Sequence, residues 1–149
     1  MGDVHACMGD GEIMVTGLEI PAEVTVTLEV LKGISIDNPM LEDGEACYTI
    51  ASHENVETAV YTAVKAMTDI LMRELGMSLE DAGMLLSAMG NLQFCQVVDP
   101  KRTVRMEMKK TVLKKLFLIF GRSYRPFYIG FLIWAAKRSG RLLSGLFCL

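Results

Sequence analysis

The stretch ENVETAVYTAVKAMTDILMRELG, residues 54–76, carries the clearest secondary-structure pattern in the chain. Its apolar residues recur every three or four positions, which is the spacing of one face of an α-helix. They are Val56, Val60, Val64, Met67, Leu71 and Leu75. Gly76 follows directly, and glycine often ends a helix because it adopts a left-handed backbone without strain. The sequence therefore predicts a helix over residues 54–75.

A second helix is predicted immediately after the first. Ser78 and Asp81 have nearly the spacing of a capping box, in which the hydroxyl accepts a backbone N–H and the acidic side chain reaches back. Met89 is the last residue before another glycine, Gly90. These two signals predict a helix over residues 78–89.

Strands are expected on both sides of the helices. Residues 24–32 alternate, with Val24, Val26, Leu28 and Val30 on one face, which predicts a half-buried strand. Further strands are expected at residues 13–20, 46–51, 92–98 and 103–108, separated by turn sequences such as Asp37-Asn38-Pro39. The order β, then α, then β predicts an α+β fold with a mostly antiparallel sheet and two covering helices.

Charge is distributed very unevenly along the chain. All 18 acidic residues and only six of the 15 basic ones lie in residues 1–107, a local net charge of −12. The remaining nine basic residues lie in residues 108–149, with no acidic residue among them. Such a change indicates segments with different roles or origins. We therefore divide the chain into residues 1–108 and a basic, apolar tail, residues 109–149, which we expect to be helical.

Two interpretations of this tail stay open. Its apolar runs, residues 116–120 and 127–136, are shorter than the ~20 residues that span a bilayer as a helix. A basic amphipathic helix on a membrane surface, with Tyr128 and Trp134 at the interface, is one hypothesis. A shifted reading frame or fusion scar is the second, and the abrupt change in composition favours it. Nucleic-acid binding is not expected, because the interleaved basic and aromatic residues form no recognisable motif.

The cysteines give an expectation about location. They are widely spaced, form no CxxC pair and follow no secretory signal, which favours a reducing, cytoplasmic setting. They are Cys7, Cys47, Cys95 and Cys148.

Candidate chemistry is concentrated in residues 2–12, GDVHACMGDGE. Asp3 and His5 point to the same side of an extended strand, and the glycines that follow allow a turn that brings Asp10 and Glu12 near them. Imidazole together with carboxylates suits zinc, whereas oxygen ligands alone suit calcium or magnesium. The alternative is a Gly-Asp-Gly turn in which Asp10 bonds its own backbone.

This loop resembles the signature GDxHxxxGDGE of the acetamidase/formamidase family. The matching residues are Gly2, Asp3, His5, Gly9, Asp10, Gly11 and Glu12. The resemblance continues through VTGLEI at residues 15–20, SLEDAGMLLSAMGNLQ at 78–93 and QVVDPKRTVRMEM at 96–108. It implies hydrolysis of the C–N bond of small linear amides, such as formamide or acetamide, to a carboxylate and ammonia.

The resemblance also implies roles for the loop residues. We assign Asp3, His5 and Asp10 to a metal ion, expected to be zinc with calcium as the alternative, and we assign Glu12 together with Asp10 to proton transfer. Family members are longer, so this chain is expected to be the C-terminal half, completed by a missing N-terminal half or by a second copy. The isolated chain is then expected to be inactive, and a structural or membrane-associated remnant is the alternative function.

Two further residues have competing interpretations. Cys7 shares a strand face with His5 and is an alternative nucleophile. We expect an inert thiol instead, because an unperturbed cysteine is mostly protonated near neutral pH. His53 precedes the first predicted helix and is expected to be a solvated or capping-region residue.

Overall fold

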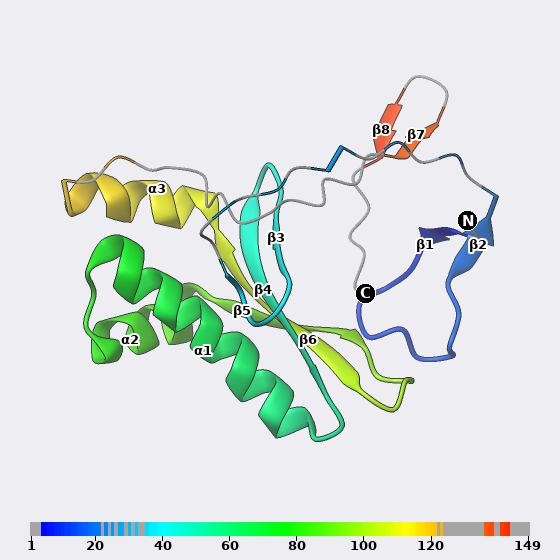
Figure 1. Cartoon of the computed structure of the whole chain (residues 1–149), viewed down its shortest axis with the longest axis horizontal. Helices are drawn as coiled ribbons and strands as arrows, with labels where there is room; N and C mark the ends of the chain where they lie inside the picture. The colour runs from blue at the N-terminus through cyan, green and yellow to red at the C-terminus, as the bar shows by residue number, and fades with distance from the viewer. Residues whose placement is uncertain are drawn as a thin grey trace.

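The computed structural model describes residues 4–21, 23, 25, 27, 28, 30, 32, 35–121, 123, 136–138 and 141–143. Its centre is a four-stranded antiparallel sheet with helices α1 and α2 packed on one face (Figure 1). The predicted α+β fold, with a mostly antiparallel sheet and two covering helices, is confirmed.

The sheet has the strand order β3-β4-β6-β5. Its strands are β3 (Met40–Glu42), β4 (Ala46–His53), β5 (Asn91–Gln96) and β6 (Arg102–Lys109). The long central strands β4 and β6 pair along their whole length, from Ala46 opposite Lys109 to His53 opposite Arg102. Because side chains alternate along a strand, this pairing fixes one set of residues toward the helices and another set toward the opposite face.

The helices begin and end where local signals place them. Helix α1 (Val56–Leu75) is capped by Asn55, whose Oδ1 accepts from the Thr58 N–H at 2.9 Å, and it ends at Gly76 with a φ of 70°. Helix α2 (Leu79–Met89) is capped by Ser78, whose hydroxyl accepts from the Asp81 N–H at 3.0 Å. Both predicted helices are therefore confirmed, to within two residues at each end.

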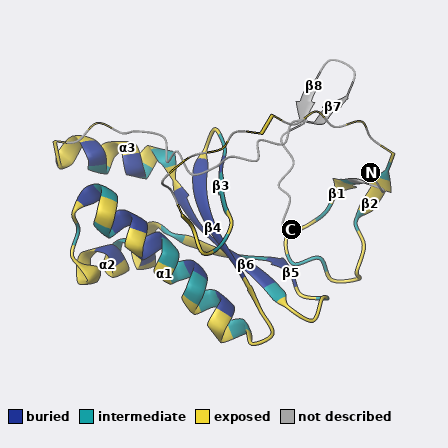
Figure 2. Cartoon of the chain, in the orientation of Figure 1, coloured by how far each residue is buried: buried dark blue, intermediate teal, exposed yellow. Residues whose placement is uncertain are grey.

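The core lies between this sheet and the helices, and Figure 2 shows dark blue, buried segments on β4, on β6 and along α1. Met67 and Leu71 of α1 have no exposed surface, and Val104 of β6 is equally buried. The Thr49 hydroxyl donates to the Ala63 carbonyl at 2.7 Å, which links β4 to α1 inside this core. Apolar burial on this face therefore holds the sheet and helices together.

The N-terminal segment differs from the prediction. Strand β1 (Val4–Cys7) pairs with β2 (Leu18–Ile20), so only the last three residues of the expected strand 13–20 form one. Val15 has a φ of 60°, which a strand does not accommodate. In the expected strand 24–32, part of which lies outside the described residues, Leu28 is 76% exposed and Val30 is 84% exposed. The half-buried strand predicted there is wrong for these two residues, because no described element covers them.

The tail begins as part of the same core. Helix α3 (Lys110–Ile119) follows β6 directly, and its Leu113 and Phe117 are buried in the core cluster. Strands β7 (Ala136–Arg138) and β8 (Arg141–Leu143) form an antiparallel pair further on, whereas Tyr128, Trp134 and Cys148 lie outside the described residues. Within the part of the chain that the structure describes, every helix is too short or too polar to cross a membrane.

Candidate active site

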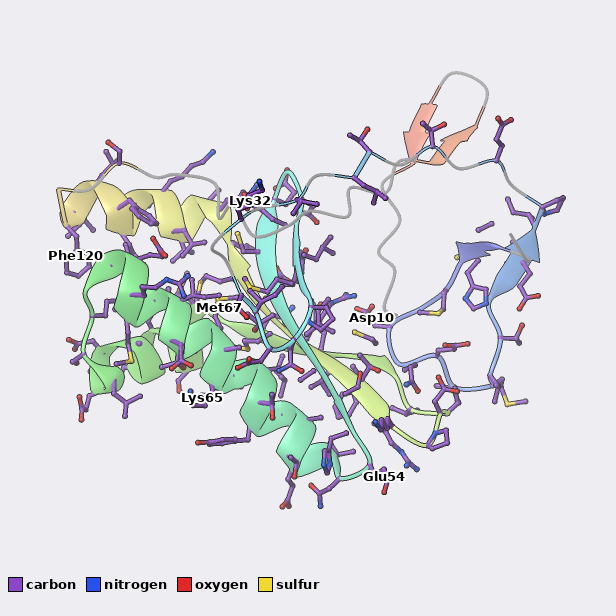
Figure 3. All side chains as sticks on the ribbon, in the orientation of Figure 1. Asp10, Lys32, Glu54, Lys65, Met67 and Phe120 are labelled. Atoms are coloured by element: carbon purple, nitrogen blue, oxygen red, sulfur yellow. The ribbon has the colours of Figure 1, made fainter. Side chains whose placement is uncertain are left out.

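The loop after β1 returns to the edge of the sheet. The Glu12 N–H donates to the Gly9 carbonyl at 3.2 Å, which closes a turn, and Gly11 within it has a φ of 90°. Glu12 then forms a single parallel β-bridge with Gln96 at the end of β5. Figure 3 labels Asp10 on this loop. The glycine-flanked turn thus presents Asp10 and Glu12 toward β5 and β6.

Asp10 is held by a buried arginine from the centre of the sheet. Arg105 Nη2 donates to both carboxylate oxygens of Asp10, at 2.9 Å and 3.0 Å. The Arg105 side chain is only 7% exposed, whereas that of Asp10 is 57% exposed. Arg105 lies between Val104 and Met106, which both face the helices, so its side chain points to the opposite face of the sheet. This ion pair fastens the loop to that face.

A row of polar side chains fixes the arginine. Its Nε donates to Gln93 Oε1, and Gln93 Nε2 donates in turn to Glu107 Oε2 at 2.5 Å. Asn91 Nδ2 donates to the same oxygen of Glu107 at 3.3 Å. The guanidinium also lies over the ring of Tyr48, 5.5 Å from the ring centroid. Strands β4, β5 and β6 thus each contribute to one preorganised polar cluster around Arg105.

Tyr48 extends this cluster to the turn before β4. Its hydroxyl donates to Asp43 Oδ2 at 3.2 Å, while Asp43 Oδ1 accepts from the backbone N–H groups of Glu45 and Ala46. Burial raises the pKa of Tyr48 well above its ordinary value, the charges of Asp43 and Glu107 raise it further, and Arg105 opposes them. Tyr48 is therefore a neutral hydrogen-bond donor at physiological pH.

His5 is positioned on the small β1–β2 hairpin. It lies directly opposite Glu19, and its Nε2 is 3.3 Å from Glu19 Oε1. The ring packs against Gly17, where a Cβ would lie 3.1 Å from His5 Cγ. The absence of a side chain at Gly17 thus leaves space for the imidazole.

The expected metal ligands are not gathered in the described structure. Asp3 lies outside the described residues, His5 contacts Glu19, and both oxygens of Asp10 accept from Arg105. Among the residues that the structure describes, no group of three or more His, Cys, Asp and Glu is arranged to hold a metal ion. The assignment of a metal ion to Asp3, His5 and Asp10 remains a prediction.

The two other candidate residues, Cys7 and His53, lie at or near the ends of secondary-structure elements. Cys7 is an exposed free thiol at the end of β1, and its role as a nucleophile remains untested. His53 Nδ1 accepts from the Asn55 N–H at 2.9 Å, immediately before α1. The expected capping-region role of His53 is therefore confirmed.

The residues that hold the Asp10 loop against the sheet were not predicted from the sequence. Arg105 and Glu107 alternate with the core residues Val104 and Met106, and this period of two was a visible signal for a charged face on a central strand. Gln93 shows the same alternation in β5. The contact with Asp10 had no such signal, because it joins positions 95 residues apart in sequence.

Together, these features define an α+β protein in which a glycine-flanked carboxylate turn is docked on a buried arginine of a central strand. The fold and sequence are similar to those of three solved structures. An acetamidase from Bacillus halodurans is 39% identical with a TM-score of 0.70, over 75% of this chain and 38% of that one. A predicted acetamidase/formamidase from Thermoanaerobacter tengcongensis is 34% identical with a TM-score of 0.66, over 80% of this chain and 38% of that one.

An acetamidase from Yersinia enterocolitica is 31% identical with a TM-score of 0.62, over 73% of this chain and 33% of that one. No protein-family model matches the chain, and no curated protein matches it either. On the structural matches, the chain belongs to the acetamidase/formamidase family. It spans between 33% and 38% of the length of these relatives.

Proposed function

We propose that this chain carries part of the active site of a hydrolase that cleaves the C–N bond of small linear amides. The observation that carries the proposal is the match in fold and sequence to acetamidases, at up to 39% identity. The docking of Asp10 on Arg105 supports it further, because the family's signature loop is held at a preorganised polar face. Preorganised polar groups are what hydrolysis of an unreactive amide requires.

The reaction converts an amide and water into a carboxylate, ammonia and one proton. A water oxygen bonds to the carbonyl carbon, the C–N bond then breaks, and the departing nitrogen takes up a proton. A general base must remove a proton from the water, and an acid must deliver one to the nitrogen. One carboxylate performs both steps if it faces the water first and the nitrogen afterwards.

Glu12 is the residue that we assign to these proton transfers. It is half-buried, and among the residues that the structure describes its carboxylate has no hydrogen-bond partner. Asp10 on the same turn is already paired with Arg105, which favours a role in holding the turn. We propose that the remaining wall of the pocket comes from a portion that this chain does not span, or from a second copy.

The test is ammonia release from formamide and acetamide. The full chain is assayed alone and after co-expression with the portion of the Bacillus halodurans acetamidase that it does not match. We expect turnover by the assembled pair and its reduction by about 10²- to 10⁴-fold in Glu12→Gln. Glu23→Gln, which removes an exposed carboxylate later in the chain, is the matched control and should retain activity. A folded, assembled pair without turnover would contradict the proposal.

The metal ion is a separate part of the proposal. Elemental analysis of the same assembled protein tests it, with zinc expected first and calcium second. About one ion per chain, lost together with turnover on chelation and in His5→Ala, would support a metal site. Full turnover with a metal content at background would overturn it. No step in the reaction above is assigned to the ion.

A further inference from the structure

The contact between Asp10 and Arg105 has the chemistry of a small ligand in a binding site. Beyond its Cα, an aspartate is a CH₂–COO⁻ group, which corresponds to acetate. Both oxygens of this group accept from the guanidinium of Arg105, at 2.9 Å and 3.0 Å. Both bonds come from the same nitrogen, Nη2, and charge-assisted hydrogen bonds from arginine are a common way to recognise a carboxylate.

We propose that Arg105 is a binding site for short carboxylates of the acetate type, and that Asp10 occupies this site when no ligand is bound. The choice of acetate rests on the proposed function, since a carboxylate is the product of amide hydrolysis. Recognition of a carboxylate as such rests only on the geometry around Arg105. Asp10 would then act as an internal competitor for the reaction product.

Arg105 has the burial and support of a preformed site. Its side chain is 7% exposed, its Nε is fixed by Gln93, and its Cζ lies over the ring of Tyr48. A guanidinium that is already oriented loses little freedom on binding a second planar group. The cluster therefore needs no rearrangement to receive a carboxylate in place of Asp10.

Glu107, the other acid close to Arg105, does not compete with Asp10 for the contact with the guanidinium. Glu107 lies two residues further along β6, but its Oε2 accepts from the amide groups of Gln93 and Asn91. Gln93 thus separates the two charges, since it accepts from Arg105 and donates to Glu107. In the described structure, Asp10 is the carboxylate in direct contact with Arg105.

Asp10 is also placed so that its carboxylate can move away from Arg105. Its side chain is 57% exposed, and it lies between Gly9 and Gly11. A Cβ at either glycine would meet no atom within 4 Å, so the turn has open space around it. A tethered group of this kind acts at an effective concentration of roughly millimolar or above. Free acetate should therefore bind the wild-type chain only weakly.

The experiment measures binding of ¹³C-labelled acetate to the full chain by NMR titration. We expect the dissociation constant of Asp10→Ala to be at least tenfold lower than that of wild type. Asp69→Ala is the matched control, because it frees the exposed Lys65 from an ion pair on α1 without exposing a built site. Its affinity for acetate should equal that of wild type, and the neutral analogue acetamide should show no gain in Asp10→Ala.

A second pair of variants separates binding from damage to the fold. Asp10→Asn keeps the size of the side chain and should also bind acetate more tightly than wild type. Adding Arg105→Lys to Asp10→Ala keeps the positive charge but removes the planar donor group, and should reverse the gain. Equal affinity in wild type, Asp10→Ala and Asp10→Asn would overturn the proposal, as would undiminished binding after Arg105→Lys. The assay needs no turnover, so its outcome is independent of whether the chain hydrolyses amides.

Discussion

Gly17 and His5 pack directly against each other across the β1–β2 hairpin. A Cβ at Gly17 would lie 3.1 Å from Cγ and 3.2 Å from Nδ1 of the His5 ring, and 2.8 Å from the Cys7 carbonyl oxygen. Because the carbonyl belongs to the backbone of the partner strand, it cannot move aside without disturbing the hairpin. The position of His5 in the candidate site therefore depends on Gly17, which lies twelve residues further along the chain in the same small hairpin.

This contact predicts the effect of Gly17→Ala. The added methyl group should displace the imidazole from Glu19 and destabilise the hairpin by about 1–3 kcal/mol, as overpacking usually does. Amide hydrogen exchange in Val4–Cys7 and Leu18–Ile20 should become faster, and the His5 ring resonances should shift. Gly9→Ala, where a Cβ meets nothing within 4 Å, is the control. Equal exchange rates in the two variants would contradict this prediction.

A second prediction concerns the ion pair between Lys110 and Glu42. Lys110 Nζ lies 2.7 Å from Glu42 Oε1, and the two side chains are only 16% and 6% exposed. Lys110→Met leaves a buried carboxylate without this cation, and such a change costs about 3–5 kcal/mol. Urea unfolding should show the loss. Lys115→Met, at an exposed position of the same helix, should be nearly neutral, and equal losses in both variants would contradict the role of the pair.

A third prediction concerns Tyr48 at high pH. Burial and the nearby acids Asp43 and Glu107 raise its pKa, so the folded chain holds the phenolic proton more tightly than the unfolded chain. The stabilisation that comes from holding the phenolic proton of Tyr48 is fully present below the ordinary tyrosine pKa of about 10. It declines as the pH rises above that value. The stability advantage of wild type over Tyr48→Phe should therefore shrink between about pH 10 and pH 11.

Urea unfolding of both proteins across this range measures the effect. Tyr61→Phe, on the exposed face of α1, is the matched control for removal of a phenol. A difference between wild type and Tyr48→Phe that does not change with pH would show that Tyr48 titrates alike in the folded and unfolded chains.

The helices were predictable because their signals are local. Asn55, Gly76 and Ser78 act on backbone groups within one turn, so each works in almost any tertiary context. Strand β3 was missed because its three residues lie between two turn sequences and are too few to show a period. Its position depends on pairing with β4, which is a tertiary contact.

The strand prediction at residues 24–32 failed for a different reason. Alternation shows which side chains share a face, but it does not show whether anything covers that face. Leu28 and Val30 do share the expected spacing, yet both are exposed.

Of the candidate site, the loop residues were predictable from the sequence, whereas the residues of the sheet were not. The loop residues His5, Asp10 and Glu12 were visible in sequence because their types and spacing match a signature. Arg105 was not identified, since a lone arginine in a strand usually indicates an exposed face. Its importance follows from its burial and from the contact with Asp10, which only the folded chain brings about.

If this chain contributes catalytic residues to amide hydrolysis, the oxygen of the new carboxylate must come from water, and analysis of the products can show this. The chain, assembled with the remaining portion of the Bacillus halodurans acetamidase, is given acetamide in ¹⁸O-labelled water, and acetate and ammonia are quantified. We predict equal amounts of the two products, a single ¹⁸O atom in each new acetate, and loss of both products in Glu12→Gln. A folded assembly that forms neither product, or that forms both equally well in Glu12→Gln, would contradict the claim.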